Sequence, residues 1–269
     1  MTADFDPKAY WEKRLTLAYG FQGVGYLSLG LSYNRWLYRL RKHVFRRTAR
    51  QIIASHPSGK ILDIGSGTGF YIDQWKELGM KRITGSDFTE TAVSHLKARH
   101  PGSEFYVLDI GGDQTIWQGG SFDMISAMDV LFHIVDDARY ERAIKNIHAL
   151  LKPGGWFLWT ENFLRNGREI YAPHEVYRSL ETIGKILQSA GFEIVSRRPM
   201  FWLMNAPVDS TNLLLGLWWK SLEKIIRFHN LIGNLLGALL FPLEFALVKM
   251  MPESPTTEIM VCRRRPAGS

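Results

Sequence analysis

Cysteine is nearly absent from this sequence, since Cys262 is the only one among 269 residues. A single thiol excludes a disulfide framework, a zinc site built from several cysteines and the paired-cysteine redox motifs. We expect no signal peptide either, because the N-terminus reads Met-Thr-Ala-Asp-Phe-Asp-Pro, with no basic stretch followed by an apolar one. These two absences predict a cytoplasmic protein whose cysteine is reduced.

The sequence also has no unbroken apolar run of the length that crosses a bilayer. Its longest apolar stretch extends from Leu231 to Val248 but contains Asn234, Pro242 and Glu244. These residues argue against a transmembrane helix, which needs about 20 consecutive, mainly apolar residues. A peripheral contact with a membrane stays open.

Acidic residues are in deficit, and the formal net charge is +7 at pH 7. Much of the excess falls in one short segment near the N-terminus. Three interpretations stay open: a solvated helix face, a site for an anionic substrate, or attachment to anionic lipid or nucleic acid. We expect no nucleic-acid partner, because the segment lacks a recognisable binding module and its aromatic residues have the spacing of core positions. This basic cluster consists of Arg35, Arg39, Arg41, Lys42, Arg46, Arg47 and Arg50.

Short apolar runs alternate with helix-like segments from Lys60 onward. This alternation is typical of a mostly parallel sheet covered by helices on both faces. The predicted strands are Lys60–Ile64, Arg82–Ser86, Glu104–Val107, Phe122–Ala127, Trp156–Thr160, Phe192–Ser196 and Glu258–Arg264. The predicted helices include Phe70–Leu78, Glu90–Arg99, Ala138–Leu151 and His174–Ala190.

The strand–helix rhythm divides the chain into four parts. Residues 1–55 read as a helical N-terminal cap, and residues 56–198 as the core. Residues 199–252 interrupt the rhythm with Leu, Trp, Phe and Met at helical spacing, so we expect a hydrophobic helical insertion. Residues 253–269 supply a last strand and a tail.

A glycine-rich turn follows the first predicted strand, in Ile61-Leu-Asp-Ile-Gly-Ser-Gly-Thr-Gly69. Glycines let a ligand approach the backbone, and the N-terminus of the next helix favours negative charge. A dinucleotide fingerprint would have its last glycine at position 70, where Phe70 stands, and the Walker sequence Gly-Lys-Ser/Thr is absent. The turn therefore predicts a site for the carboxylate of an amino-acid-like ligand.

Carboxylates follow the next two predicted strands. Asp87 comes after the second strand, where it can accept hydrogen bonds from both hydroxyls of a ribose. Asp109 follows the third strand, at a place suited to an exocyclic amine such as that of adenine. Three such features on successive strand ends predict a site for an adenosine joined to an amino acid.

These motifs resemble the class I S-adenosylmethionine-dependent methyltransferase family over residues 55 to 198. The resemblance rests on the glycine turn, Ser86-Asp87, Leu108-Asp109-Ile110, Phe122-Asp-Met-Ile-Ser-Ala-Met-Asp-Val-Leu-Phe-His133 and Leu151-Lys-Pro-Gly-Gly155. It implies an α/β fold of the Rossmann-like, three-layer kind, with seven mostly parallel strands and an antiparallel last strand. It also implies S-adenosylmethionine as methyl donor and S-adenosylhomocysteine as product.

The resemblance assigns expected roles along the cofactor. Asp87 would hold the ribose, Asp109 the adenine edge, and Met128 the pocket wall. For Asp63 two roles stay open, direct cofactor contact and orientation of the glycine turn. Beside these, the expected cofactor site contains Gly65, Ser66, Gly67, Gly69, Phe88 and Ile110.

The segment Tyr10-Trp11-Glu-Lys-Arg14 resembles N-terminal segments that fold over the cofactor in some family members. On this interpretation Tyr10 covers the cofactor and Arg14 lies near the carboxylate of its methionine. A helix that packs its aromatic residues on the sheet is the alternative.

The acceptor is expected beyond the ends of the fourth and fifth strands. His133 is the first candidate for a base, because a histidine titrates near neutral pH, although packing beside the adenine is an alternative role. Asp129 and Glu161, with Asn162, are further catalytic candidates or an oxygen-rich site for Mg²⁺, but the family's metal-dependent members have Asp-Asn where this chain has Glu161-Asn162. His174 is a further catalytic candidate, as a lid residue on the substrate side, and the start of a helix is its alternative role.

The sequence excludes some acceptors. Methylation of cytosine carbon-5 needs a cysteine near the fourth strand, and Cys262 lies on the last one. The motif Asn/Asp-Pro-Pro-Tyr of amino-methylases is replaced by Ala127-Met-Asp-Val130. We therefore expect O-methylation of a small molecule or glycan, such as a sugar, glycolipid or secondary metabolite.

Two alternatives remain for the function, and three for the insertion. The protein is otherwise an N- or C-methyltransferase for a hydrophobic or lipid-linked acceptor, or a non-catalytic protein that binds S-adenosylmethionine. The insertion can form a homodimer, cap a hydrophobic acceptor pocket, or contact a membrane surface.

Overall fold

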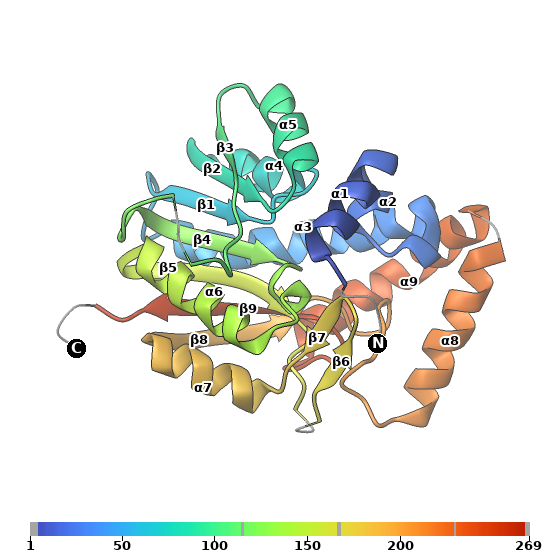
Figure 1. Cartoon of the computed structure of the whole chain (residues 1–269). Helices are drawn as coiled ribbons and strands as arrows, with labels where there is room; N and C mark the ends of the chain where they lie inside the picture. Colours follow the sequence, from blue (N-terminus) through green and yellow to red (C-terminus); the bar gives the residue numbers. More distant parts are fainter. Residues whose placement is uncertain (1–4, 114–115, 166–167, 229, 267–269) are drawn as a thin grey trace.

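The computed structural model describes residues 5–113, 116–165, 168–228 and 230–266 (Figure 1). Its main sheet contains β1 (Lys60–Ile64), β2 (Arg82–Asp87), β3 (Glu104–Val107), β4 (Phe122–Met128), β5 (Leu151–Glu161), β8 (Phe192–Pro199) and β9 (Glu258–Arg264). The helices that cover it are α3 (Gly30–Ile53), α4 (Phe70–Glu77), α5 (Glu90–Arg99), α6 (Asp137–Leu150) and α7 (Leu180–Ala190). The remaining helices are α1 (Pro7–Leu17), α2 (Phe21–Val24), α8 (Leu213–Phe228), α9 (Asn230–Met250) and the short turns η1 (Leu27–Leu29) and η2 (Leu131–His133).

The seven strands lie in the order β3-β2-β1-β4-β5-β9-β8. Only β9 runs against its neighbours, because it pairs antiparallel with both β5 and β8 while the other pairings are parallel. This confirms the predicted Rossmann-like sheet with an antiparallel last strand. The order reverses between β1 and β4, which is where open α/β sheets bind ligands, beyond the carboxyl ends of the strands.

Two apolar cores cover the two faces of the sheet. On one face, α3, α4 and α5 contribute large side chains such as Phe45, Trp75 and Leu96. On the other, α6 and α7 contribute Ile144 and Leu187. Because each central strand is covered on both faces, it reads as a nearly continuous apolar run, as in the Ile61-Leu62 part of β1.

Side-chain caps define where the helices of the core begin. Thr89, Asp136 and Ser179 accept hydrogen bonds from backbone amides in the first turns of α5, α6 and α7. The cap at Ser179 corrects one prediction, since the segment His174–Ala190 is not helical throughout. Residues Glu175–Tyr177 form β7, which pairs antiparallel with β6 (Ile170–Ala172), and the helix starts only at Leu180.

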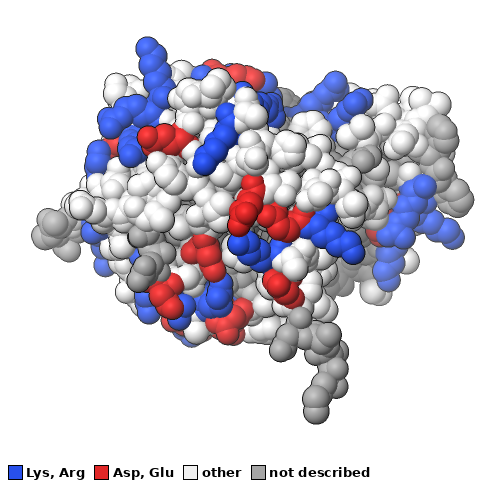
Figure 2. Space-filling model, turned by 45° about the horizontal axis from the view of Figure 1, so that its top comes forward, with Lys and Arg blue, Asp and Glu red and all other residues white. Residues whose placement is uncertain are grey.

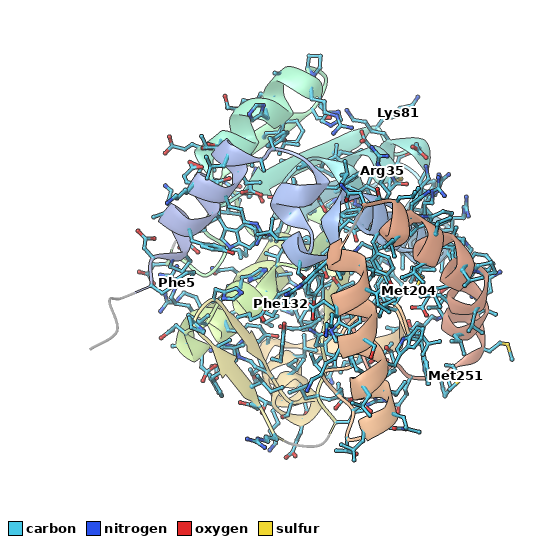
Figure 3. All side chains as sticks on the ribbon, turned by 90° about the vertical axis from the view of Figure 1, so that its right-hand side faces the viewer. Phe5, Arg35, Lys81, Phe132, Met204 and Met251 are labelled. Atoms are coloured by element: carbon cyan, nitrogen blue, oxygen red, sulfur yellow. The ribbon has the colours of Figure 1, made fainter. Side chains whose placement is uncertain are left out.

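The insertion contains the helices α8 and α9, which lie together at one end of the molecule (Figures 1 and 3). The expected breaks at Asn234, Pro242 and Glu244 do not interrupt α9, which is one helix of 21 residues. By length and composition α9 is the one candidate membrane span in the described part of the chain. Only 22% of its most apolar 18-residue stretch is buried, so it is not an ordinary core helix. The four-part domain division itself stays a prediction.

Glu244 fixes α9 to the loop after β8. Its fully buried carboxylate accepts hydrogen bonds from the backbone amides of Trp202, Leu203 and Met204, at 2.6, 2.8 and 3.3 Å. Burial raises the pKa of this carboxyl, although the three amides oppose the shift. A charge in this position is stabilised only by its partners.

Glu244→Ala is therefore expected to lower the free energy of unfolding by about 3 kcal/mol, because it leaves buried amides without an acceptor. Glu244→Gln keeps one acceptor oxygen and is expected to cost about half as much. Urea unfolding of the purified variants measures both. The control Glu141→Ala removes an exposed carboxylate from α6 and is expected to cost about 0.5 kcal/mol or less. Equal stability of all three variants would contradict the role of Glu244.

Candidate functional site

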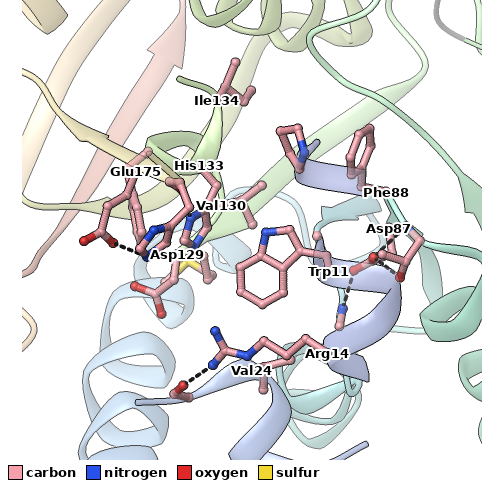
Figure 4. A pocket seen from close by; sticks show the side chains of 18 of the residues that line it. Trp11, Arg14, Val24, Asp87, Phe88, Asp129, Val130, His133, Ile134 and Glu175 are labelled. Atoms are coloured by element: carbon pink, nitrogen blue, oxygen red, sulfur yellow. Dashed lines mark hydrogen bonds and ion pairs between the residues drawn. The ribbon is translucent and has the colours of Figure 1, made fainter. Parts of the chain in front are cut away.

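A cavity of about 1050 Å³ opens beyond the carboxyl ends of β1, β2 and β4 (Figure 4). One half is lined by the glycine turn after β1, the end of β2 and the loop after β3. The other half is lined by the ends of β4 and β5, the β6–β7 hairpin and the N-terminal helices. The cavity therefore joins the expected cofactor and acceptor sites.

The glycine turn has a backbone that other residues adopt only with strain. Gly65 and Gly67 have φ values of 66° and 50°, in the left-handed region. A Cβ added to Gly65 would lie 2.3 Å from a methyl of Val130, so no side chain fits there. Gly65, Ser66 and Gly67, which the sequence predicts as cofactor residues, line the cavity.

Asp87 lies at the end of β2 and connects that strand to the glycine turn. One carboxylate oxygen accepts from the amide of Gly67 at 2.8 Å, and the other accepts from the amide and hydroxyl of Thr89 at 3.0 and 2.7 Å. Burial raises the pKa of this carboxyl against these hydrogen bonds. A carboxylate has about four acceptor positions, so Asp87 retains capacity for a ligand's hydroxyls.

Asp109 lines the cavity after β3, where its carboxylate pairs with Arg139 of α6 and accepts from the amide of Gly111 at 3.1 Å. The other predicted wall residues of this half, Phe88, Ile110 and Met128, line the same cavity. The residues present thus offer an apolar slot with a carboxylate at either end, which fits an adenosine.

Two predicted cofactor residues lie outside the cavity wall. Asp63 is buried beneath the turn and accepts a hydrogen bond from Ser126 of β4, and burial raises its pKa to about 7. It therefore supports the turn rather than a ligand. Gly69 begins α4, and a Cβ there would meet His100 and Leu96 on the far side, so Gly69 allows α4 and α5 to pack.

Helix α1 covers the cavity with Tyr10, Trp11 and Arg14. Figure 4 shows Trp11 between Asp87 on one side and Asp129 with His133 on the other. Arg14 donates to the carbonyl of Gly25 at 2.6 Å and to the hydroxyl of Tyr10 at 3.0 Å, with its guanidinium 4.8 Å from the Trp11 ring. The segment thus lies over the cavity, and its contact with a cofactor stays a prediction.

A carboxylate on α1 attaches that helix to the core. Glu12 accepts from the backbone amide of Glu90 at 2.8 Å and from that of Thr91 at 3.3 Å, at the start of α5. Free amides at a helix N-terminus favour such a carboxylate.

His133 and His174 lie together on the acceptor side. The Nδ1 of His133 is 2.9 Å from the backbone carbonyl of His174, so Nδ1 carries the proton and Nε2 is the acceptor nitrogen. Burial lowers the pKa of His133 to about 4, and the carbonyl of His174 opposes that shift. The imidazole is therefore neutral near pH 7.

Asp129 lines the cavity but is already paired. Its carboxylate forms an ion pair with Arg41 of α3 and accepts from the hydroxyl of Thr160 at 3.0 Å. With φ of 60°, Asp129 is the one non-glycine residue with positive φ in the described part of the chain. Because both Arg41 and Thr160 bind this carboxylate, it positions Arg41 rather than serving as a free base.

The prediction that Glu161 takes part in catalysis is wrong. Successive side chains of β5 point to opposite faces, so Thr160 and Asn162 face the cavity side while Glu161 faces α6. Its carboxyl is fully buried, accepts from the hydroxyl of Tyr140 at 2.9 Å, and has a pKa that burial raises to about 8.

The Mg²⁺ site expected from Asp129, Glu161 and Asn162 does not fit this arrangement. The two carboxylates lie on opposite faces of the sheet, and one is bound to Arg41. Across the described ranges no group of three or more His, Cys, Asp or Glu side chains is placed to hold a metal ion.

Several cavity residues were not predicted as site residues, chiefly on the acceptor side. Arg41 had a signal: it lies between Leu37 and Phe45 at four-residue spacing, on the apolar face of α3. A charge on a buried helix face requires a partner. The others come from separate parts of the chain and include Tyr26, Tyr38, Phe132, Tyr177, Asn205 and Thr257.

Residues 61–155 match the family model described as a methyltransferase domain. A ubiquinone biosynthesis O-methyltransferase from Albidiferax ferrireducens is 31% identical over 38% of this chain and 40% of its own length. A demethylmenaquinone methyltransferase from Chlorobaculum tepidum is 25% identical over 65% of this chain and 79% of its own length. The match to the first of these relatives thus spans about two fifths of that relative's length.

Solved structures share the fold. The [4+2]-cyclase SpnF has a TM-score of 0.53 at 18% identity, with 82% of this chain and 81% of that chain covered. A SAM-dependent methyltransferase from Methanosarcina mazei has a TM-score of 0.50 at 14% identity, with 78% and 93% covered.

Fold and site together define a Rossmann-like α/β protein whose cavity has residues that fit S-adenosylmethionine. The family match narrows this class to methyltransferases for one segment of the chain, which runs from the glycine turn to Gly155. Residues 61–155 are thus identified as a methyltransferase domain, which is the part of the chain that the family model matches.

Asp87→Ala is expected to weaken S-adenosylmethionine binding at least about tenfold, because it removes an acceptor for the ribose and the anchor of Gly67. Isothermal titration calorimetry on the folded variant measures the loss, with thermal unfolding as a check on folding. Asp113→Ala is the control, because it removes an exposed carboxylate from the loop after β3. Equal affinities in the two variants would refute the assignment of Asp87.

The raised pKa of the buried Glu161 carboxyl is expected to make the stability of the protein depend on pH. This pKa rises from about 4.5 in the unfolded chain to about 8 in the fold, so the folded protein binds the extra proton. Stability from this group is complete below pH 4.5 and is lost as the pH rises through 8. Glu161→Gln is expected to reduce that loss in urea unfolding across this range. An unchanged pH profile would contradict the assignment.

Proposed function

We propose that this protein transfers a methyl group from S-adenosylmethionine to a hydroxyl of a small, partly aromatic acceptor. The supporting observation is the neutral His133, which lines the acceptor half of the cavity and whose Nδ1 is engaged by the carbonyl of His174. A hydroxyl acceptor benefits from a base, whereas a soft or already nucleophilic acceptor does not need one.

The cofactor half supplies binding and alignment. The sulfonium of S-adenosylmethionine, when bound, provides an activated methyl and a neutral leaving group. Asp87 accepts the ribose hydroxyls, Asp109 binds the adenine edge, and the amides of the glycine turn with Arg14 bind the methionine carboxylate. Helix α1 then excludes water, which would otherwise compete as the nucleophile.

His133 acts as the general base. Its tautomer is fixed by the carbonyl of His174, so the lone pair on Nε2 is available for the acceptor's hydroxyl proton. Because the pKa is lowered to about 4, the base is unprotonated throughout the neutral range. The same low pKa makes it a weak base, which suits an acidic hydroxyl such as a phenol better than a sugar alcohol.

Aromatic side chains favour a flat acceptor. Tyr26, Tyr38, Phe132 and Tyr177 line the acceptor half beside the ion pair of Arg41. Burial raises the pKa of Tyr38 to about 12, so its hydroxyl stays protonated as a donor. Relatives with ubiquinone or menaquinone chemistry in their names agree with a ring-bearing acceptor. A ring carbon is the alternative methyl acceptor, and a non-catalytic role would leave the base unused.

His133→Ala is expected to lower kcat by about 10² to 10⁴ while the affinity for S-adenosylmethionine stays within about twofold. Formation of S-adenosylhomocysteine with a panel of phenols and quinols measures turnover. His56→Ala, in the loop before β1, is the matched control and is expected to retain full activity. Turnover of His133→Ala at the rate of the control would remove His133 as the base. No product with any acceptor of the panel would favour the non-catalytic alternative.

A further inference from the structure

An apolar stripe runs along the exposed side of α9. Leu231, Leu235, Leu239 and Leu243 follow one another at intervals of four residues and expose between 51% and 75% of their surface. Residues at this spacing share one helix face. From residue 231 to residue 248 the helix has a single charged side chain, Glu244, and it is buried. Such a continuous apolar face is rare on a monomer exposed only to water.

The basic cluster of α3 divides into two groups with different surroundings. Arg41 pairs with Asp129 in the cavity, while Lys42 and Arg46 pair with Glu77 of α4. The other four lie on the exposed side of α3 and, within the part of the chain that the structure describes, form no ion pair with a carboxylate. We call them the basic row: Arg35, Arg39, Arg47 and Arg50.

The basic row lies beside the apolar stripe because α3 and α9 pack in the same direction. A Cβ on Gly237 would collide with the Trp36 ring, and the Trp36 and Phe241 rings are 5.4 Å apart. Further toward the C-terminal ends of both helices, the rings of His43 and Phe245 are 4.3 Å apart. The two helices thus advance together over about two turns.

Polar contacts confirm that the two rows border each other. The Arg39 guanidinium lies 4.2 Å from the Trp36 ring, and the indole nitrogen of Trp36 donates to Asn234 of α9 at 3.0 Å. Lys249, near the end of α9, lies over Phe245. Burial lowers the pKa of His43, and the charges of Lys249, Arg47 and Arg50 add to that shift. The basic row therefore forms one edge of the apolar stripe.

Helix α8 extends the same kind of surface. Leu214 and Ile225 are exposed, with Lys220 and Lys224 exposed on the same helix. Figure 3 shows α8 and α9 together on one side of the molecule, and Figure 2 shows Lys and Arg beside uncharged surface at the end where Figure 1 draws α8.

We propose that α9 and α8, with the basic row of α3, dock the protein on the surface of an anionic lipid membrane. The leucines enter the boundary between headgroups and acyl chains, and the arginines contact the lipid phosphates. A helix with an apolar face edged by Lys and Arg is suited to this interface. Each basic side chain near an anionic surface adds to the binding, so the row acts cumulatively.

Two features of α9 favour a surface position over a membrane span. Its inner side is fixed to the protein by Glu244 and by the close contact with Trp36.

A second copy of the chain is a poorer occupant than lipid, because a symmetric contact would bring two basic rows together. Lipid phosphates supply the opposite charge.

Flotation of the full chain with vesicles tests the proposal. The probes are vesicles of phosphatidylcholine alone and vesicles in which about one third of the lipid is phosphatidylglycerol. The protein is expected to float with the anionic vesicles, to remain below with the neutral ones, and to dissociate at high salt. This readout needs no methyl acceptor, so its failure would leave the proposed activity untouched.

Two variants separate the apolar and the charged contributions. Leu235→Ser with Leu239→Ser, and Arg35→Gln with Arg39→Gln and Arg47→Gln, are each expected to weaken vesicle binding about tenfold or more. The matched control Lys81→Gln with Lys97→Gln and Lys185→Gln removes the same charge elsewhere and is expected to bind within about twofold of the wild type. Circular dichroism checks that all remain folded.

Three results would overturn the proposal. One is wild-type protein that stays soluble with anionic vesicles. Another is equal weakening by the arginine variant and by the lysine control, which would reduce the effect to net charge. The last is a dimer, seen by light scattering, that the Leu235→Ser, Leu239→Ser variant dissociates, since the stripe would then be a contact between copies.

Discussion

The site depends on one hydrogen bond, from the amide of Gly67 to the carboxylate of Asp87. It joins the turn after β1 to the end of β2 and so sets the distance between the two parts of the cofactor half. The turn can reach Asp87 only because Gly65 and Gly67 have left-handed backbones, and Val130 leaves no room for a Cβ at Gly65. Asp63 supports the turn from beneath, through Ser126 of the neighbouring strand. In a buried network whose polar groups all have hydrogen-bond partners, the bonds select one arrangement of the turn in addition to stabilising it.

The sequence signals for this half are local. A buried strand, a turn of glycines and a carboxylate at the next strand end lie within 27 residues, and parallel strands bring their carboxyl ends to one edge. The incorrect predictions concern the direction in which a side chain points, not the place of its residue in the fold. Glu161 was placed at the correct strand end, but its side chain faces α6 because the side-chain period of a strand is two. Asp63 and Gly69 similarly belong to the motif while lying behind the wall.

The acceptor half could be predicted only in part, because its walls come from distant parts of the chain. Tyr26 and Tyr38 belong to the N-terminal region, Tyr177 to a hairpin after β5, and Asn205 to the loop after β8. No short-range pattern joins these residues, and the hairpin itself was mistaken for the start of α7. His133 was identified because it follows β4 directly. Its tautomer depends on the His174 carbonyl, 41 residues further on, which only the folded chain supplies.

The arginines of α3 show how one helix serves two environments. Arg41 falls on the same face as Leu37 and Phe45, so folding buries its charge, and Asp129 with its strained backbone compensates that charge. Arg35 and Arg39 are exposed on another side of the helix, where neither forms an ion pair with a described carboxylate. Exposed, unpaired like charges repel one another, so a row of them lowers stability unless something outside the chain neutralises it. The parallel packing of α9 places an apolar stripe beside that row, and one anionic interface satisfies both.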